Sequence, residues 1–372
     1  YFGGLLGDAL SYSIGRYFHQ DIRRLPILRS HPQWLSAAEI YFQRYGVASL
    51  LVGRYIGPLR PMLPMVAGML NMPLGRFIVV SMLAAAGWSV AYMLPGWATG
   101  AALRLPLPPG FWPQAGAVAA GLALVLVISV QGSLRGQRHA SLLTAGSSLA
   151  LLLGLIYGWP QLTQLDQGLL TIIQEQRSPA LDELMVLVTR LGDLQTQVAA
   201  GVLLSLVLLV TRQWRAALFA GGALLGTALA NSLLKTLFAR TRPEVLLEPL
   251  GSFSFPSGHS SAAFAFFLVL AILAGRGQPV RMRLTWLLLA CLPAAAIAIS
   301  RVYLGVHWPS DIIAGAVLAT CICALSLTLV QWRTPLVALP AKIWWLLLPV
   351  ILALLGGIAT WQWSADLLRY RY

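Results

Sequence analysis

Three short polar stretches interrupt long apolar runs in the second half of this sequence. They are KTLFARTRP (235–243), FPSGHSS (255–261) and SRVYLGVHWPSD (300–311). A charged side chain at the edge of a bilayer is costly enough that it usually marks a function. The charged residues of these stretches are therefore the first candidates for a functional site.

The cations and small residues of these stretches are suited to binding phosphate. Lys235, Arg242 and Arg301 supply three fixed positive charges, and a guanidinium matches phosphate oxygens with two parallel hydrogen bonds. Ser257 and Gly258 directly precede an apolar run long enough to form a helix. Backbone N–H groups at a helix N-terminus bind anions, and glycine allows the backbone to approach closely. We therefore predict an anion-binding cradle at Ser257 and Gly258.

The two histidines can transfer a phosphoryl group and a proton. His307 and Asp311 are four residues apart, which places them on one face of a helical turn. A carboxylate there can hold one imidazole nitrogen as N–H and leave the other free to attack. His259 is suited to protonating a leaving oxygen. These residues predict phosphoryl transfer through a phosphohistidine. Since the stretches contain no carboxylate cluster that could hold Mg²⁺, we expect the cations to replace a metal, and we expect no cofactor.

Each of these residues also has a structural explanation of its own. A single arginine beside an apolar helix is more often an interfacial anchor than a ligand. The tetrapeptide PSGH alone is compatible with an ordinary helix start capped by Ser257. The functional interpretation is favoured because the three stretches occur together. The chain has five histidines, and two of them fall in these stretches.

The elements that carry these residues are predicted to be membrane-spanning helices. Of the 372 residues, 58% are hydrophobic and 10% are charged, whereas soluble chains are about half apolar and about a quarter charged. About 20 apolar residues cross a bilayer as a helix, and these runs lack the alternation of membrane-barrel strands. We predict an all-α, polytopic membrane protein with helices near 77–94, 116–132, 141–158, 195–211, 216–237, 260–274, 284–299, 312–331 and 343–360.

The basic loops of the second half alternate with the polar stretches along the chain. They lie at 212–215, 275–283 and 333–342. Since successive helices alternate in direction, these loops share one membrane face, and 239–259 and 300–311 share the other. The chain has 26 Lys+Arg and 12 Asp+Glu, a net charge of +14, and such an excess marks cytoplasmic loops. We therefore predict a site on the outer face and anionic lipids as neighbours or substrates. Nucleic acid is not expected as a partner, because no basic soluble domain is present.

The chain divides into blocks of different composition. Residues 1–134 are rich in Gly and Pro with short apolar segments, and residues 140–332 contain longer apolar runs. The basic joint RGQRH (135–139) is the predicted boundary, and 343–372 adds a further helix and a tail. The chain starts at Tyr1 without a methionine or a basic segment. We therefore expect the first block to lack its N-terminal part.

The three polar stretches resemble the signature of the type-2 phosphatidic acid phosphatase superfamily, and every signature position is filled over residues 140–332. The resemblance implies a metal-independent phosphatase acting on lipid phosphates or pyrophosphates at the outer leaflet. It implies that His307 is the nucleophile and His259 the general acid. The phosphate-binding positions that it implies are Lys235, Arg242, Ser257, Gly258 and Arg301.

A segment of the first block, GRYIGPLRPMLPMVAGML (53–70), predicts a broken or re-entrant helix. Pro58, Pro61 and Pro64 are too close together for one straight helix. Broken backbone at membrane depth occurs where it lines a cavity or a pathway, and Arg54 and Arg60 there suggest an anionic headgroup. The alternative is an amphipathic interfacial loop whose arginines extend to the surface.

The first block resembles the DedA family of membrane proteins. The matching pieces are GGLLGDALSYSIGR (3–16), YFQRYGVASLLVGRYIGPLRPMLPMVAGML (41–70) and FIVVSMLAAAGWSVAY (77–92). The resemblance implies lipid transport, including flipping of undecaprenyl phosphate, with Arg54 and Arg60 at the family's functional arginine positions. The family also uses acidic residues upstream of this sequence. Asp8 belongs to a different motif and does not replace them.

The fusion suggests one joint function in the bacterial cytoplasmic (inner) membrane. Undecaprenyl pyrophosphate would be dephosphorylated on the outer face by the second block, and the monophosphate would be returned by the first. The alternative is a phosphatase of phosphatidic acid or phosphatidylglycerol phosphate with a first block that only binds lipid. A pure transporter is disfavoured by the intact set of site residues, and a haloperoxidase by the many spans. The sequence leaves the oligomeric state open.

Overall fold

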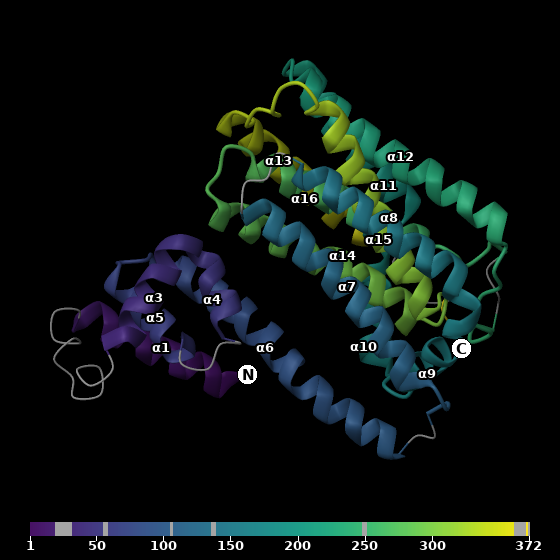
Figure 1. Ribbon diagram of the computed structural model, residues 1–372, viewed down its shortest axis with the longest axis horizontal. Helices are drawn as coiled ribbons and strands as arrows, with labels where there is room; N and C mark the ends of the chain where they lie inside the picture. Colours follow the sequence, from purple (N-terminus) through teal and green to yellow (C-terminus); the bar gives the residue numbers. More distant parts are fainter. Residues whose placement is uncertain are drawn as a thin grey trace. The chain divides into compact units, whose positions relative to one another are not determined.

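The chain folds into helices grouped in two compact units. The computed structural model describes residues 1–18, 32–54, 59–104, 107–134, 139–247, 251–360 and 370, and the regular structure in these ranges is helical. The first unit comprises Tyr1–Leu105 and Gln278–Thr285, and the second comprises Pro106–Gly277 and Trp286–Tyr372 (Figure 1). The predicted all-α class is confirmed.

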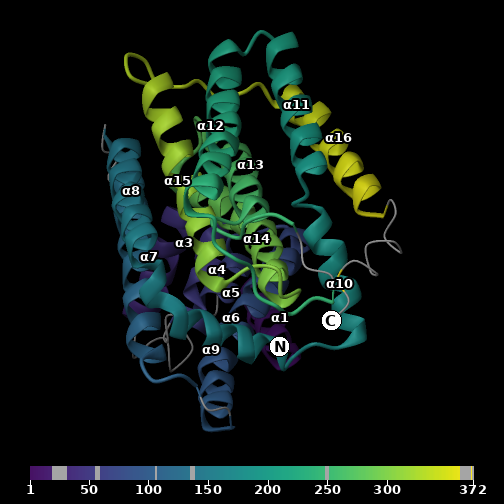
Figure 2. The same ribbon diagram turned by 90° about the vertical axis from the view of Figure 1, so that its right-hand side faces the viewer.

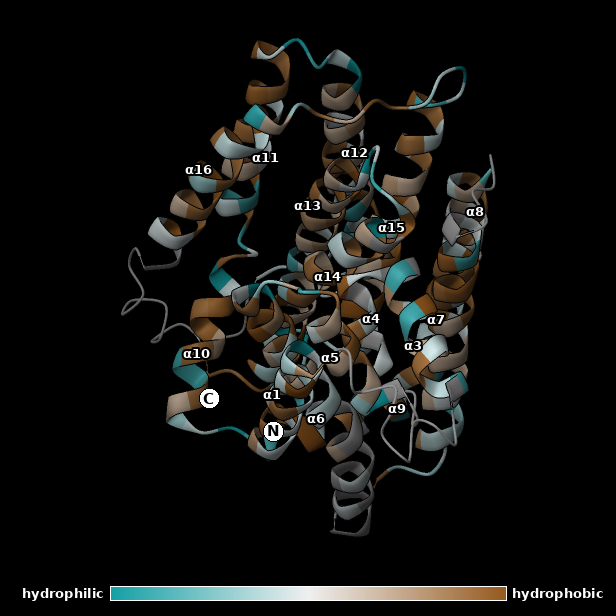
Figure 3. Cartoon of the chain, turned by 90° about the vertical axis from the view of Figure 1, so that its left-hand side faces the viewer, coloured by the Kyte–Doolittle hydropathy of each residue, from teal (hydrophilic) through white to brown (hydrophobic). Residues whose placement is uncertain are grey.

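The described residues include seven helical segments long and apolar enough to cross a membrane. Six of these spans lie on long helices of the second unit, to which α14 belongs from Trp286 onward. They are α7 (Phe111–Leu134), α12 (Trp214–Phe238), α13 (Gly258–Gly275), α14 (Val280–Tyr303), α15 (Pro309–Val330) and α16 (Ala341–Thr360). The seventh begins with α8 (Ala140–Gly158) and extends to Gln174. An eighth is obtained if α10 (Pro179–Arg190) and α11 (Leu194–Val210), which meet at 41°, form one bent span. Apolar residues predominate along the lengths of these helices (Figure 3). The protein is therefore polytopic, as predicted.

Helix α15 is the centre of the second unit. It packs against α8, α12 and α13 and is the most deeply buried of the candidate spans. Phe219 from α12, Phe266 from α13 and Cys323 from α15 contribute to one buried cluster. Near its start, Gly315 lies so close to α13 that a Cβ would come within 2.8 Å of the Ser257 carbonyl oxygen. The starts of α13 and α15 are therefore in direct backbone contact.

Two shorter helices lie at the same end of the second unit as the joint between α14 and α15 (Figure 2). Helix α8 continues through the 3₁₀ turn Trp159–Leu162 into α9 (Thr163–Gln174), and α10 follows. Gln174 at the end of α9 donates to the carbonyls of Val302 and Tyr303 at 3.2 and 3.0 Å. These contacts fix α9 beside the turn that carries the third polar stretch.

The basic loops meet at the other end of this unit. Arg215 donates to the carbonyls of Val330, Thr334 and Pro335, and Arg276 donates to Gln331 at 3.2 Å. All three basic regions thus share one end, as predicted from the alternation of helix direction. Which end faces the cytoplasm stays a prediction.

The first unit contains α1 (Phe2–Tyr17), α3 (Pro32–Tyr45), α4 (Val47–Gly53), α5 (Leu59–Met69) and α6 (Leu74–Arg104). Helices α1 and α5 touch through glycines. A Cβ on Gly15 would lie 2.0 Å from the Met65 carbonyl oxygen, and one on Gly68 would lie 2.1 Å from that of Tyr12. Tyr12 also stacks on Phe77, with ring centroids 4.2 Å apart.

The predicted break in the first block takes the form of two short helices. Helices α4 and α5 have 7 and 11 residues, and neither is long enough to cross a bilayer. Pro61 and Pro64 both lie in α5. Pro61 is in the first turn, where its missing N–H would have no helical partner. Pro58 lies outside the described residues. The broken-helix prediction is confirmed.

The compact units divide between residues 105 and 106, earlier than the predicted boundary at 135–139. Residues 135–138 lie outside the described residues, and α7 packs against α8 within the second unit. The functional assignment of residues 1–134, 140–332 and 343–372 stays a prediction.

Candidate active site

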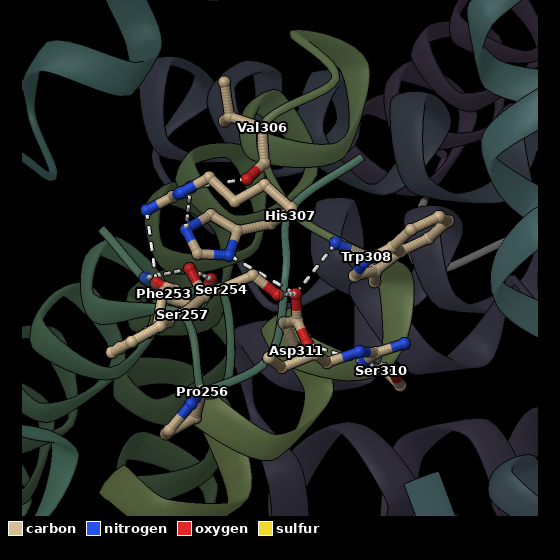
Figure 4. A network of polar contacts seen from close by, with 12 residues as sticks. Phe253, Ser254, Pro256, Ser257, Val306, His307, Trp308, Ser310 and Asp311 are labelled. Carbon is tan, nitrogen blue, oxygen red and sulfur yellow. Dashed lines mark hydrogen bonds and ion pairs between the residues drawn. The ribbon is translucent and has the colours of Figure 1, made fainter. Parts of the chain in front are cut away.

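The three polar stretches meet at one end of the second unit. Arg242 Nη1 lies 3.1 Å from His307 Nε2, and the Ser257 N–H donates to the Asp311 carbonyl at 3.0 Å. Figure 4 shows His307 next to Asp311, with Ser254 and Ser257 beside it. Residues far apart in the sequence, such as Arg242 and His307 at a separation of 65 positions, are therefore brought into one site.

Local backbone conformation at Ala239 and Gly305 positions the first and third polar stretches at this end of the unit. Helix α12 ends when Ala239 adopts a left-handed conformation with φ of 43°, and its N–H bonds the Lys235 carbonyl. The turn between α14 and α15 contains Gly305 with φ of 71°, where a Cβ would lie 2.6 Å from Val245 Cβ. An L-residue with a side chain is strained in this conformation. Gly305 therefore lets the turn pack against the loop that follows α12.

His307 and Asp311 form a buried pair. His307 is 1% exposed and Asp311 is 0% exposed, and Nδ1 lies 3.4 Å from Oδ2. A carboxylate accepts only, so Nδ1 carries the proton and Nε2 keeps its lone pair. Arg242, on the other side of the ring, favours the same tautomer, because a guanidinium can only donate a hydrogen bond to Nε2. Both neighbours select the tautomer in which Nε2 is free to act as a nucleophile.

The surroundings of His307 favour its neutral form. Burial lowers the pKa of His307 well below its ordinary value of 6.5, and the nearby positive charges lower it further. These charges belong to Arg242, Arg301, Lys235 and His259. At neutral pH the imidazole is therefore uncharged.

Arg242 and Lys235 are held by the loop that precedes α13. Arg242 donates to the Ser252 carbonyl at 2.7 Å, to the Ser252 hydroxyl at 2.9 Å and to the Val306 carbonyl. Lys235 Nζ donates to the Phe253 carbonyl at 2.7 Å. These contacts hold both cations close to His307, where their positive charges can act on a bound anion.

Arg301 lies deeper than the other two cations. It is 2% exposed, and its Nη1 donates to Thr189 Oγ1 at 2.8 Å and to the Tyr370 hydroxyl at 3.0 Å. Its Nε is buried with no hydrogen-bond partner in the described part of the chain. A buried donor left unpaired costs about 1–3 kcal/mol, and more when charged. A bound anion would relieve that cost.

The structure differs from the predicted anion-binding cradle at Ser257 and Gly258 in one respect. Ser257 caps α13, its side chain accepting from the Ser260 N–H at 3.4 Å, but its own N–H is used by the Asp311 carbonyl. That N–H is therefore not available to an anion, and the Gly258 N–H is the next candidate. Gly258 lies beside Lys235, whose Cε would be 3.9 Å from a Cβ at this position.

His259 has an acidic partner that the sequence did not indicate. Its Nε2 lies 2.7 Å from Oδ1 of Asp193, the N-cap residue of α11. Gly192 allows this approach, because a Cβ there would lie 3.3 Å from the His259 ring and 2.4 Å from Ile297 Cγ2. The available signal was an aspartate directly before an apolar run, which is common at helix starts and does not specify a partner.

Two other charged residues were also missed. Arg240 Nη1 donates to Asp311 Oδ1 at 2.7 Å, and its Nη2 donates to Asp166 Oδ2 at 2.7 Å. Arg240 stands inside the first polar stretch, between Lys235 and Arg242, and could have been singled out there. Asp166 lies on α9 and belongs to none of the three stretches.

The two arginines predicted to bind a headgroup in the first unit have different surroundings. Arg54 is buried and forms an ion pair with Asp8, which also accepts from Ser81 Oγ at 2.7 Å. Arg54 Nη1 is buried with no hydrogen-bond partner among the described residues. The Arg60 guanidinium lies 4.1 Å from the centroid of the Trp88 ring. The Asp8 partner is an addition to the sequence interpretation, which assigned Asp8 no role beside Arg54.

Comparisons with known proteins match the two parts of the chain separately. The PAP2 superfamily model matches residues 216–335, and the VTT domain model matches residues 1–98. Phosphatidylglycerophosphatase B of Bacillus subtilis (strain 168) is 34% identical over 152 residues, covering 37% of this chain and 70% of that protein.

Two relatives match the first part. Inner membrane protein YabI of Escherichia coli (strain K12) is 36% identical over 104 residues, covering 28% of this chain and 41% of that protein. Undecaprenyl phosphate transporter A of Bacillus subtilis (strain 168) is 29% identical over 98 residues, covering 25% of this chain and 48% of that protein. The chain thus spans less than half the length of these two relatives. Together with the 70% coverage of phosphatidylglycerophosphatase B, these matches show that the chain belongs to the PAP2 superfamily through its C-terminal part and carries a VTT (DedA-family) domain at its N-terminus.

Proposed function

We propose that this protein is a metal-independent lipid phosphatase that acts through a phosphohistidine at His307. The observation that carries the proposal is the state of that imidazole. It is buried and neutral, its Nδ1 proton faces Asp311, and its Nε2 lies 3.1 Å from Arg242 in a cluster of cations. A nucleophile with one fixed tautomer beside several positive charges is suited to attack a phosphorus atom.

In the first step, His307 Nε2 attacks phosphorus, and the bond from phosphorus to the leaving oxygen breaks as the N–P bond forms. His259 gives a proton to the leaving oxygen. Arg242 exchanges its contact with Nε2 for a phosphate oxygen. Lys235, Arg301 and the Gly258 N–H neutralise the charge that develops on the phosphoryl group, a contribution of about 10²–10³ in rate for one well-placed donor.

In the second step, water attacks the phosphohistidine. His259 takes a proton from the water, the O–P bond forms, and the N–P bond breaks to restore neutral His307 and release inorganic phosphate. Asp193 supports this exchange, because its carboxylate holds the His259 Nε2–H at 2.7 Å and leaves Nδ1 to give and accept the proton.

We propose undecaprenyl pyrophosphate as the substrate and the outer face of the bacterial inner membrane as the location. The support is the pairing of a PAP2 part with a first part similar to undecaprenyl phosphate transporter A. Removal of one phosphate from undecaprenyl pyrophosphate produces undecaprenyl phosphate, the compound in that relative's name. The second candidate is a glycerophospholipid phosphate, which the name of phosphatidylglycerophosphatase B favours.

The first unit is proposed to return the monophosphate to the inner leaflet through Arg54 and Arg60. Support comes from the buried Arg54 Nη1, which has no hydrogen-bond partner among the described residues. A phosphate headgroup could satisfy this donor while competing with Asp8 for the guanidinium.

The hydrolysis is tested with purified protein in detergent, in excess chelator, by phosphate release from undecaprenyl pyrophosphate and from phosphatidylglycerol phosphate. We expect release from both to require His307, and a higher kcat/KM for the isoprenoid. His307→Ala should abolish release and phosphoenzyme labelling. A higher kcat/KM for the glycerol lipid would establish the second candidate, and loss of all release in chelator would refute the metal-independent mechanism.

Transport is tested in vesicles loaded with undecaprenyl phosphate. His307→Ala should leave flipping intact, whereas Arg54→Ala should abolish flipping and leave phosphate release unchanged. Loss of both activities from either substitution would contradict two separable sites.

A further inference from the structure

A second carboxylate lies behind the His307–Asp311 pair. Asp166 on α9 is 0% exposed and is joined to Asp311 through Arg240, with both N–O distances 2.7 Å. Arg240 itself is buried, and its guanidinium lies 4.8 Å from the Trp159 ring and 5.4 Å from the Trp308 ring. A buried carboxylate–guanidinium–carboxylate chain costs desolvation energy that its mutual attraction only partly offsets. Because this chain of charges costs energy to bury, we looked for what Asp166 and Arg240 contribute to the site.

The contacts of Asp311 show what Arg240 contributes to orientation. Arg240 occupies Oδ1, so that Oδ2 is left to accept from Ser254 at 2.7 Å, from the Trp308 N–H at 2.9 Å and from His307. Each carboxylate oxygen thus has its own set of donors. Without Arg240, rotation about the last side-chain bond of Asp311 would be less restricted, and Oδ2 would be held less firmly against His307 Nδ1.

Asp166 positions the same residues from the other side. Its Oδ1 accepts from the Ser310 N–H at 2.8 Å, and its Oδ2 accepts from the Ser310 hydroxyl at 2.6 Å. Ser310 is the second residue of α15, where a backbone N–H has no helical partner. A carboxylate is stabilising at a helix N-terminus. Asp166 therefore anchors the helical turn that carries Asp311.

Asp166 also changes the net charge of the group that supports His307. Arg240 paired with Asp311 alone would neutralise the carboxylate that supports His307. With Asp166 sharing the guanidinium, the group of three carries one net negative charge. That charge remains to stabilise the positive imidazole ring that forms when His307 takes up the phosphoryl group.

We infer that Asp166 and Arg240 are positioning residues for phosphoryl transfer, acting on His307 through Asp311. The inference rests on the proposed function, and it assigns a role to a helix that lies outside the three polar stretches. Neither residue is expected to contact the substrate. Their removal should therefore lower kcat and leave KM nearly unchanged.

The test compares Asp166→Asn, Asp311→Asn and the double variant, all as full-length protein in detergent. Asparagine keeps the size of the side chain and an acceptor for the Ser310 N–H, but removes the charge. We expect kcat to fall about 10- to 100-fold for Asp166→Asn, with KM within about twofold and a proportionally slower formation of the phosphoenzyme. Since Asp166 acts through Asp311, the double variant should be no slower than Asp311→Asn by more than about twofold.

Arg240→Lys and Ser310→Ala complete the test. Lysine keeps the charge but cannot bridge two carboxylates with a planar fork, so we expect a loss similar to that of Asp166→Asn. Ser310→Ala retains the backbone N–H and removes only the hydroxyl, and should cost less than about tenfold in kcat. If Asp166→Asn does not yield folded protein by size-exclusion chromatography, Ser310→Ala tests the same role, and a kcat equal to that of the wild type would then refute it.

The outcomes separate this inference from the proposed function. Absence of a phosphoenzyme in the wild-type protein would refute the phosphohistidine mechanism itself. A normal wild-type phosphoenzyme, together with Asp166→Asn at wild-type kcat, would refute only the positioning role. Multiplicative losses in the double variant, or a raised KM with unchanged kcat, would also refute it.

Discussion

The pairing of Asp193 with His259 leads to a prediction about which substrates need that pair. Asp193→Asn keeps a hydrogen-bond acceptor beside the imidazole and removes its charge. A hydrogen bond to a charged group contributes roughly 1.5–3 kcal/mol. The Asp193 side chain is 36% exposed, so solvent screening reduces this to about 1–1.5 kcal/mol. The corresponding loss is roughly 5- to 15-fold in the steps that use His259 as acid or base.

The assay uses the leaving group to isolate those steps. A lipid phosphate releases an oxygen that must be protonated, whereas p-nitrophenyl phosphate releases a stable phenolate that needs no proton. With Asp193→Asn we expect phosphoenzyme formation, followed by rapid quench, to slow roughly 5- to 15-fold for the lipid and less than about twofold for the aryl phosphate. Dephosphorylation, which needs a proton taken from water, should slow equally for both substrates.

Asp182→Asn is the matched control. Asp182 pairs with Arg177 at 3.2 Å on the same unit, and none of its described contacts is with His259. It should leave all of these rates within about twofold of the wild type. Equal slowing of phosphoenzyme formation on both substrates would refute the role of Asp193, because a general loss of structure does not depend on the leaving group.

Three further predictions concern pH, packing and stability. Because the low pKa of His307 is sustained in part by the charge of Arg242, Arg242→Gln should raise that pKa. The acid limb of the kcat/KM profile should then move to higher pH, and an unchanged limb would contradict this account. Gly192→Ala places a Cβ against the His259 ring and should destabilise the fold by about 1–3 kcal/mol and slow dephosphorylation. Gly146→Ala, where a Cβ meets no atom within 4 Å, should do neither, and equal losses in both would refute the packing argument. Arg215→Ala removes three hydrogen bonds to loop carbonyls and should lower Tm by about 2–4 °C without changing kcat. A changed kcat would show that this end of the unit communicates with the site.

Features that depend on neighbours in the chain were predicted well. The apolar runs predicted spans because crossing a bilayer requires a certain length of apolar helix, which is a local property. The four-residue spacing of His307 and Asp311 predicted a contact on one helical turn. The structure places their side chains 3.4 Å apart, but His307 lies in the turn before α15 and only Asp311 lies in the helix. The segment 53–70 was predicted to be broken, and α4 ends at Gly53 while α5 begins at Leu59, although Pro61 and Pro64 both lie within α5.

Contacts between distant helices were not predicted. Asp193 and His259 are 66 residues apart, Asp166 and Arg240 are 74 apart, and Asp8 and Arg54 are 46 apart. A single charged residue at a helix start or within an apolar run has many potential partners, and its spacing to any of them carries no information.

By itself, the sequence determined that this is a multi-pass helical membrane protein and which three polar stretches hold the cations and histidines of the site. Only the tertiary structure decided that the Ser257 N–H is used by the Asp311 carbonyl, which carboxylate pairs with His259, and that Arg240 and Asp166 stand behind Asp311. The reason is physical. Hydrophobic length and helical periodicity act between neighbouring residues, whereas the pairing of buried charges depends on how α9, α11, α12, α13 and α15 pack together.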